Sequence, residues 1–348
     1  MTKNSHLLLW TFAGSAGMWL LAMQVFDPRV TGINPMILAD IQTGLIVFGI
    51  SFGLFIGAFP QASWDDRPLL QARIGWLLET VVISGVLGTV MGMYSLGRGV
   101  SYEMGGGDIA TIIGSGLAMA FLSIIYMALL VAVLFGIKQS IVKATTIATR
   151  PAFPTRPPSR IRPVVGLLMA TLIGVLTLFM QAVGIGVPLL LPLISIRTAG
   201  MVVLSLAVAL FIFGGRPLAD TLLLPFLGID GRKTSADKML VIVRGYQRIV
   251  ALLGLIIAML IPLMSLKGMG AGKEATFIPL VLGLAYIMVV FAVFLYCMLI
   301  EGLLIQHAYH HGRQLPLGDR GFIFKAVIPM FLIIFMTFMF DVIALIIL

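Results

Sequence analysis

Charged residues and cysteines are scarce in this chain of 348 residues. Only 11% of the residues are charged, and the single cysteine, Cys297, lies inside an apolar stretch. A soluble surface for a chain of this length needs more charge, and one cysteine excludes a disulfide framework. The sequence also lacks a P-loop, a dinucleotide-binding fingerprint, a nucleophile elbow and an HExxH motif, so it supports neither a membrane enzyme nor a cofactor.

Apolar residues, in contrast, make up 60% of the sequence, and the mean hydropathy is +1.10. Runs of about 20 apolar residues are long enough to cross a hydrocarbon core of about 30 Å. Such runs begin near Leu7, Ile37, Trp76, Ile109, Val164, Arg197, Ile249, Phe277 and Phe322. The sequence therefore predicts an all-α, polytopic membrane bundle of nine transmembrane helices. No convincing cleavage site follows the first run, so we expect a retained helix rather than a signal peptide.

The basic residues are unevenly distributed between the connections of these runs. With the N-terminus inside, 18 lysines and arginines fall on the inner side of the membrane and 5 on the outer side. This distribution follows the positive-inside rule. The net charge of +9 is thus explained as a topology signal, and it requires no nucleic-acid partner.

The segment 138–163, KQSIVKATTIATRPAFPTRPPSRIRP, separates two groups of apolar runs. Its prolines prevent a continuous helix, and anionic lipid would attract its six basic residues to the inner face. We therefore divide the chain into a four-helix repeat (1–137), this cytoplasmic linker, a second, degenerate four-helix repeat (164–308), and a cytoplasmic loop with a C-terminal transmembrane helix (309–348).

The two groups of runs resemble each other, which predicts a tandem repeat. TGLIVFGISFGLFIGAFP (43–60) aligns with AGMVVLSLAVALFIFGGRP (199–217), and the MYSL at Met93 aligns with the LMSL at Leu263. An even number of spans in each copy predicts parallel repeats, related by an axis along the membrane normal.

Small residues recur at helix-packing spacing in the first copy. Because lipid tails are as apolar as leucine, transmembrane helices associate through close backbone approach, which small residues permit. The residues expected to pack helices in this way are Gly49, Gly53, Gly57, Gly85, Gly88, Gly92, Gly114, Gly116 and Ala120. This spacing by itself indicates packing and not transport.

Four pieces of the first copy carry a resemblance to a known family. In order they are GLIVFGISFGLFIGAFP, GVLGTVMGM, RGVSYEMGGGD and GSGLAMAFLSIIYMALLVA. They resemble the MotA/TolQ/ExbB family, the A-type subunits of ion-driven envelope motors. The GTVxG at Gly88–Gly92 and the GLAMA at Gly116–Ala120 are the most specific. The resemblance covers about 130 residues and is faint in the second copy. It implies a bacterial cytoplasmic (inner) membrane protein with a cytoplasmic N-terminus.

The resemblance implies an ion channel subunit, with the proton as the expected ion. Family members form a homo-oligomeric ring around a single-span B-type partner (MotB/TolR/ExbD-like) and convert ion flow into mechanical work on the envelope. Thr89 and Ser123 would then be ion-pathway residues, because a hydroxyl can serve a carboxylate, water or an ion inside an apolar bore. The predicted inner loop 61–75 is short where the family carries a large cytoplasmic domain, so a flagellar stator role is not expected.

Three acidic residues are candidates for intramembrane roles: Glu79, Glu301 and Asp341. Glu79 lies near the inner end of its run, and we interpret it as a solvated anchor. Glu301 lies deeper in its run, and the sequence favours an interaction with a buried partner and exposure to solvent equally. Asp341, in FMFDVIALIIL, resembles the start of a B-type helix, although proximity to the outer interface is the simpler explanation. A face with His307, His310 and His311 has no complementary ligands, so it predicts a wet surface and not a metal site.

Two other functions stay open at this point. A degenerate family member would serve as a non-conducting membrane scaffold. A secondary transporter built from parallel repeats would show broken helices and converging charges near the middle of the membrane. In the second copy the position of Thr89 falls near Ala258, and Pro262 is expected to interrupt the helix. We therefore expect that copy to be structural.

Overall fold

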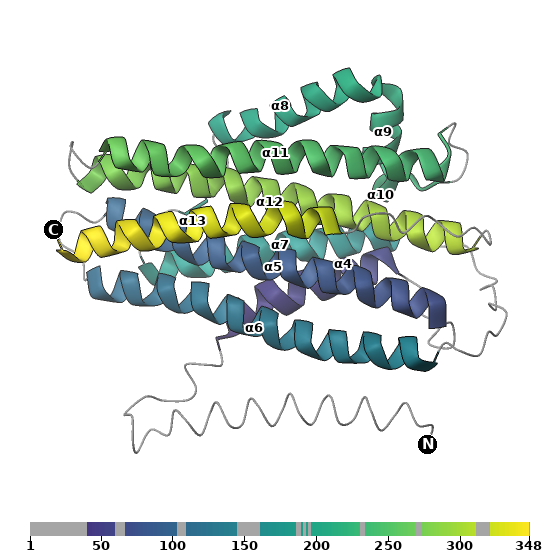
Figure 1. Cartoon of the computed structure of the whole chain (residues 1–348), viewed down its shortest axis with the longest axis horizontal. Helices are drawn as coiled ribbons and strands as arrows, with labels where there is room; N and C mark the ends of the chain where they lie inside the picture. The colour runs from purple at the N-terminus through teal and green to yellow at the C-terminus, as the bar shows by residue number, and fades with distance from the viewer. Residues whose placement is uncertain are drawn as a thin grey trace, which may run out of the picture.

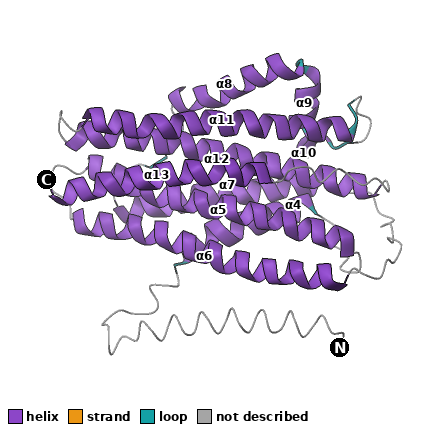
Figure 2. Cartoon of the chain, in the orientation of Figure 1, coloured by secondary structure: helices purple, strands orange, loops and turns teal. Residues whose placement is uncertain are grey.

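The computed structural model describes residues 40–59, 67–102, 109–144, 161–185, 189, 190, 193, 196–229, 234–268, 273–310 and 321–347. Regular structure among these residues is helical, without strands (Figure 1, Figure 2). The helices are α3 (Ile41–Gly44), the π-helix η2 (Leu45–Ile50), α4 (Ser51–Ala58), α5 (Arg67–Tyr102), α6 (Ile109–Ala144), α7 (Ile161–Ile185), α8 (Ile196–Phe213), α9 (Arg216–Leu222), α10 (Leu224–Leu227), α11 (Ala236–Gly268), α12 (Lys273–His310) and α13 (Gly321–Ile347). The predicted all-α class is confirmed.

Six of the described helical stretches are long and apolar enough to cross a membrane. They are Ile41–Ala58, Leu69–Val100, Gly114–Gln139, Ile161–Val183, Ala236–Met264 and Ile278–Ala308. Ala199–Phe213 and Val327–Phe340 are apolar but shorter. The chain is thus compatible with a multi-pass membrane protein. The run from Leu7 lies outside the described residues, so the count of nine helices stays a prediction.

Four long helices form a row in the order α6, α5, α12, α11. In this row α5 packs against α6 and α12, and α11 packs on the far side of α12. Neighbours run antiparallel: the first residues of α5 and α11 lie at the same end as the last residues of α6 and α12, on the right of Figure 1. The row therefore consists of two hairpins, α5–α6 and α11–α12, which meet through α5 and α12.

Shorter and flanking helices enclose the centre of this row. The η2–α4 segment packs on α5 and α12, and α7 packs on η2 and α4. On another side, α13 packs along α11, and its Phe335 ring meets Phe121 of α6 edge to face, with the ring centroids 6.3 Å apart. As a result, 94% of the residues in an apolar 18-residue stretch of α5 are buried, against 39% in such a stretch of α6.

The glycines of the second predicted run lie against α7. A Cβ built at Gly166 would come within 2.7 Å of both the Gly53 oxygen and the Gly57 Cα. A Cβ at Gly49 would come within 2.9 Å of the Ile173 side chain. The two backbones therefore approach closely where neither carries a side chain.

The tightest contact between α5 and α6 also depends on glycine. A Cβ at Gly92 would lie 2.6 Å from the Ala120 nitrogen and 2.7 Å from the Gly116 oxygen. Those atoms are backbone, so they cannot rotate away. One and two turns earlier on α5, Gly88 faces Ser123 and Gly85 faces Met127.

Gly114 does not follow the packing expectation. A Cβ there would have no atom of the described residues within 4 Å. It begins an exposed stripe that we call the α6 outer face: Gly114, Ala118, Phe121, Ile125, Ala128, Ala132, Phe135 and Gln139. Their spacing alternates between four and three residues, which places all of them on one face of the helix.

Three boundaries differ from the sequence prediction. Residues 67–75 are helical and not loop, because α5 begins at Arg67, with Pro68 tolerated in the first turn. At the predicted linker, α6 runs to Ala144 and α7 begins at Ile161. Pro262 lies inside α11, which continues to Gly268, since neighbouring groups in a bundle can satisfy the backbone groups that proline frees. Asp341 belongs to α13, and its side chain lies outside the described part.

Candidate functional site

Thr89 and Ser123 lie together in the contact between α5 and α6. The Thr89 Oγ1 donates to the Gly85 carbonyl at 3.0 Å and lies 3.3 Å from the Ala120 carbonyl on α6. The Ser123 Oγ donates to the Met119 carbonyl at 2.8 Å. Both side chains are fully buried. In this arrangement, backbone carbonyls of the hairpin accept both hydroxyl protons.

The hairpin itself explains why these two hydroxyls meet. Thr89 and Ser123 lie at similar distances from the connection 103–108, so antiparallel pairing brings them to one level. Gly88 provides the space for the Ser123 side chain, because a Cβ at position 88 would lie only 2.5 Å from the Ser123 Oγ. The GTVxG and GLAMA motifs, which carry the family resemblance, therefore form a single contact.

Further buried hydroxyls on α5 were missed by the sequence analysis. Thr80 and Ser95 are buried and donate to carbonyls one turn earlier, at 2.9 and 2.8 Å. Ser84 accepts from the Ser51 hydroxyl of α4 at 3.1 Å, directly after the π-helix η2. Serine and threonine in apolar helices often bind their own backbone. The sequence therefore gave no signal that separated these residues from Thr89.

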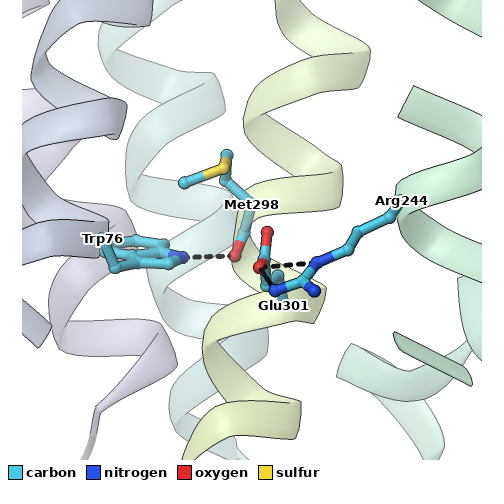
Figure 3. A network of polar contacts seen from close by, with 4 residues as sticks. All are labelled: Trp76, Arg244, Met298 and Glu301. Carbon is cyan, nitrogen blue, oxygen red and sulfur yellow. Dashed lines mark hydrogen bonds and ion pairs between the residues drawn. The ribbon is translucent and has the colours of Figure 1, made fainter. Parts of the chain in front are cut away.

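A second group of polar contacts joins α11 to α12. The Arg244 guanidinium reaches the Glu301 Oε1 through Nη2 at 2.8 Å and Nε at 3.2 Å (Figure 3). The Glu301 side chain is 4% exposed and the Arg244 side chain 22%. The carboxylate is therefore enclosed by protein, and the arginine neutralises it from the edge of the bundle.

The same region of α12 is tied to α5. Trp76 donates its indole N–H to the Met298 carbonyl at 2.7 Å, one turn before Glu301 (Figure 3). The Arg73 Nη2 donates to the Gln306 Oε1 at 2.9 Å. We call this set the polar junction: Arg73, Trp76, Arg244, Met298, Glu301 and Gln306. It links the two hairpins near the ends where α5 and α11 begin.

The acidic candidates are placed differently from one another. Glu79 is 6% exposed, which differs from the expected solvated anchor, because the neighbours of α5 cover it on nearly every side. Glu301 has its partner in Arg244, which the sequence analysis counted only as a topology charge. A usable signal existed: Arg244 and Glu301 lie at similar distances from the connection 269–272.

Metal ligands do not gather among the described residues, where no group of three or more His, Cys, Asp or Glu side chains meets. The side chains of His310 and His311 lie outside that part of the chain.

No protein-family model matches the chain. Comparisons with curated proteins and with solved structures gave no match either. The resemblance to the MotA/TolQ/ExbB family therefore rests on the sequence motifs, and its consequences are proposals.

Proposed function

We propose that the chain is an A-type subunit of a MotA/TolQ/ExbB-type motor that conducts ions, with the proton as the expected ion, across a bacterial inner membrane. One observation carries this proposal: the two most specific motifs, 88–92 and 116–120, pack against each other around Thr89 and Ser123. A membrane ion pathway needs a few polar groups among closely packed apolar helices. This contact supplies two hydroxyls in such a setting.

The α6 outer face supports an assembly with further helices. Two pairs of small residues lie on it at a spacing of four: Gly114 with Ala118, and Ala128 with Ala132. Such pairs permit close helix contact, which lipid does not require. Moreover, α6 is the end helix of the four-helix row. We propose that this face packs in a homo-oligomeric ring around a single-span B-type partner.

Charge supports the proposed orientation. Basic residues lie near the start of α5 and α11 (Arg67, Lys238) and near the end of α6 (Lys138). These helix ends share one end of the bundle (Figure 1). By the positive-inside rule this end is cytoplasmic.

The functional test is Thr89→Val, which keeps the side-chain shape and removes the hydroxyl. Each lost hydrogen bond is worth about 0.5–1.5 kcal/mol, and the loss repeats around the ring, so we expect ion flux to fall by about tenfold or more. The measurement is proton flux into vesicles that contain the chain and its B-type partner.

Thr80→Val is the matched control for Thr89→Val. Thr80 lies on the same helix, is fully buried and donates to the Trp76 carbonyl at 2.9 Å, but it does not belong to the α5–α6 hydroxyl pair. Thr80→Val is a better control than Ala258→Val. Ala258 is fully buried, so the larger valine side chain would overpack the surroundings of α11. Equal flux in both threonine variants contradicts the ion-pathway role.

A non-conducting scaffold is the second candidate. It is favoured by the fact that Thr89 and Ser123 already donate to backbone carbonyls and are fully buried. The flux experiment separates the two functions: wild-type vesicles without flux, whatever the partner, support the scaffold.

The assembly surface has its own test, the double variant Ala128→Leu/Ala132→Leu. Both alanines are exposed on the α6 outer face, so larger side chains should weaken assembly and change the stability of the single chain by no more than about 0.5 kcal/mol. The measurement is the mass of the purified complex. Ala207→Leu, an exposed alanine of α8, is the control. An unchanged mass in the double variant contradicts assembly through this face.

A further inference from the structure

A cavity of about 380 Å³ lies where the two hairpins meet α4 and α7. Its buried wall includes Leu54 of α4, Met91 of α5, Leu178 of α7 and Leu295 of α12. The volume falls within the range of about 300–1,000 Å³ that is typical of small-ligand sites. The cavity is separate from the Thr89–Ser123 contact and from the polar junction.

The described wall of this cavity offers no free polar group. Two polar side chains reach it, and each has a backbone partner: the Thr171 hydroxyl donates to the Leu167 carbonyl at 2.9 Å, and the Tyr296 hydroxyl donates to the Leu222 carbonyl. The other described wall residues carry aliphatic or methionine side chains, or none at Gly174. A buried water needs two to four polar partners. The cavity therefore suits hydrocarbon and excludes water and ions.

The mouth of the cavity opens sideways between α7 and α12. Thr171 and Val175 of α7 and Ala292 of α12 are exposed wall residues, whereas the deeper wall is buried. Only 28% of the residues in an apolar 18-residue stretch of α7 are buried, so this helix presents most of its apolar surface outward. A ligand thus enters from the surrounding bilayer rather than from water.

The dimensions match one hydrocarbon chain. Along α7 the wall extends from Leu167 to Leu178, about 16 Å at 1.5 Å per residue. This is roughly half of a 30 Å hydrocarbon core, the depth of one lipid leaflet. Among the described residues no charged side chain belongs to the wall, so nothing there would select a headgroup.

We propose that this cavity binds one acyl chain of a membrane phospholipid, which enters between α7 and α12 and leaves its headgroup outside. The proposal goes beyond the proposed ion conduction and does not depend on it. A free fatty acid would offer the same hydrocarbon chemistry, and the experiment separates the two sources.

Gly174→Leu is the decisive variant. Gly174 lines the cavity, and a Cβ built there would have no described atom within 4 Å, so a leucine side chain can begin there without a clash and should extend into the cavity. Gly200→Leu is the matched control, since Gly200 of α8 has the same open surroundings and does not line the cavity. Both substitutions replace glycine in a helix, which favours folding.

The full chain is reconstituted with phospholipids that carry a photoreactive group on one acyl chain, and the labelled peptides are identified by mass spectrometry. Wild type and Gly200→Leu should be labelled on α7 and α12, equally with zwitterionic and anionic headgroups. Gly174→Leu should show labelling of these peptides lower by about tenfold. Undiminished labelling in Gly174→Leu, or no labelling of these peptides in the wild type, would overturn the proposal. Labelling by a photoreactive fatty acid but not by the phospholipids would overturn the assigned source.

Discussion

Replacing Arg244 with methionine should destabilise the folded chain by about 3–5 kcal/mol, the cost of leaving a buried carboxylate without its partner. Arg244 holds the Glu301 carboxylate through two contacts, and that side chain is only 4% exposed. Unfolding by denaturant in mild detergent measures the loss. Lys238→Met is the control, because Lys238 lies on the same helix, carries the same charge and is exposed.

The double variant Arg244→Met/Glu301→Leu tests the cause of this loss. Apolar residues of similar volume often replace a buried ion pair at little or no cost, so the double variant should recover most of the stability. If it unfolds as easily as Arg244→Met alone, the loss comes from packing of the arginine stem and not from the stranded charge.

Gly92→Ala should separate the α5–α6 hairpin and destabilise the chain by about 1–3 kcal/mol or more, because the new Cβ overlaps atoms that cannot move independently. A Cβ at Gly92 would lie 2.6 Å from the Ala120 nitrogen. If α6 moves away to make room for this Cβ, the Ala120 carbonyl also moves away from the Thr89 hydroxyl, which lies 3.3 Å from it. We therefore expect lower flux as well as lower stability, measured on the same reconstituted samples.

Gly114→Ala provides the control for Gly92→Ala. It is the same substitution on the partner helix, at a position where a Cβ would have no described atom within 4 Å. Alanine favours helix over glycine by about 0.5–1 kcal/mol, so the stability of this variant should stay equal or rise. Equal loss in both variants would contradict the close contact between Gly92 and α6.

The helices could be predicted from the sequence because each apolar run is long enough to require one. That Thr89 and Ser123 lie side by side can also be predicted from the sequence, because the two residues are at similar distances from the connection of an antiparallel hairpin. The position of each helix in the bundle cannot be predicted in this way. Both α5 and α6 contain an apolar 18-residue stretch, yet 94% of the residues are buried in the first and 39% in the second. An apolar helix face in lipid can be covered by protein or by hydrocarbon, and the residue types do not tell which.

The contact between α5 and α12 shows a further limit. Trp76 donates to the Met298 carbonyl. Every residue has a main-chain carbonyl, so the sequence cannot indicate which one accepts this hydrogen bond. Arg244 and Glu301 could be paired through their hairpin, but the approach of one hairpin to the other is decided by packing across both hairpins. Packing of this kind depends on the combined shapes of many side chains.

The four helices of the row contain 36, 36, 33 and 38 residues, and at 1.5 Å per residue they are roughly 50–57 Å long. A hydrocarbon core of about 30 Å therefore leaves some 20 Å of each helix in the headgroup region or in water. Arg73, the seventh residue of α5, and Gln306, the fifth from the end of α12, join the ends of two of these helices. The hydrogen bond between Arg73 and Gln306 ties these two helix ends together, so a tilt or rotation of α5 would also move the end of α12.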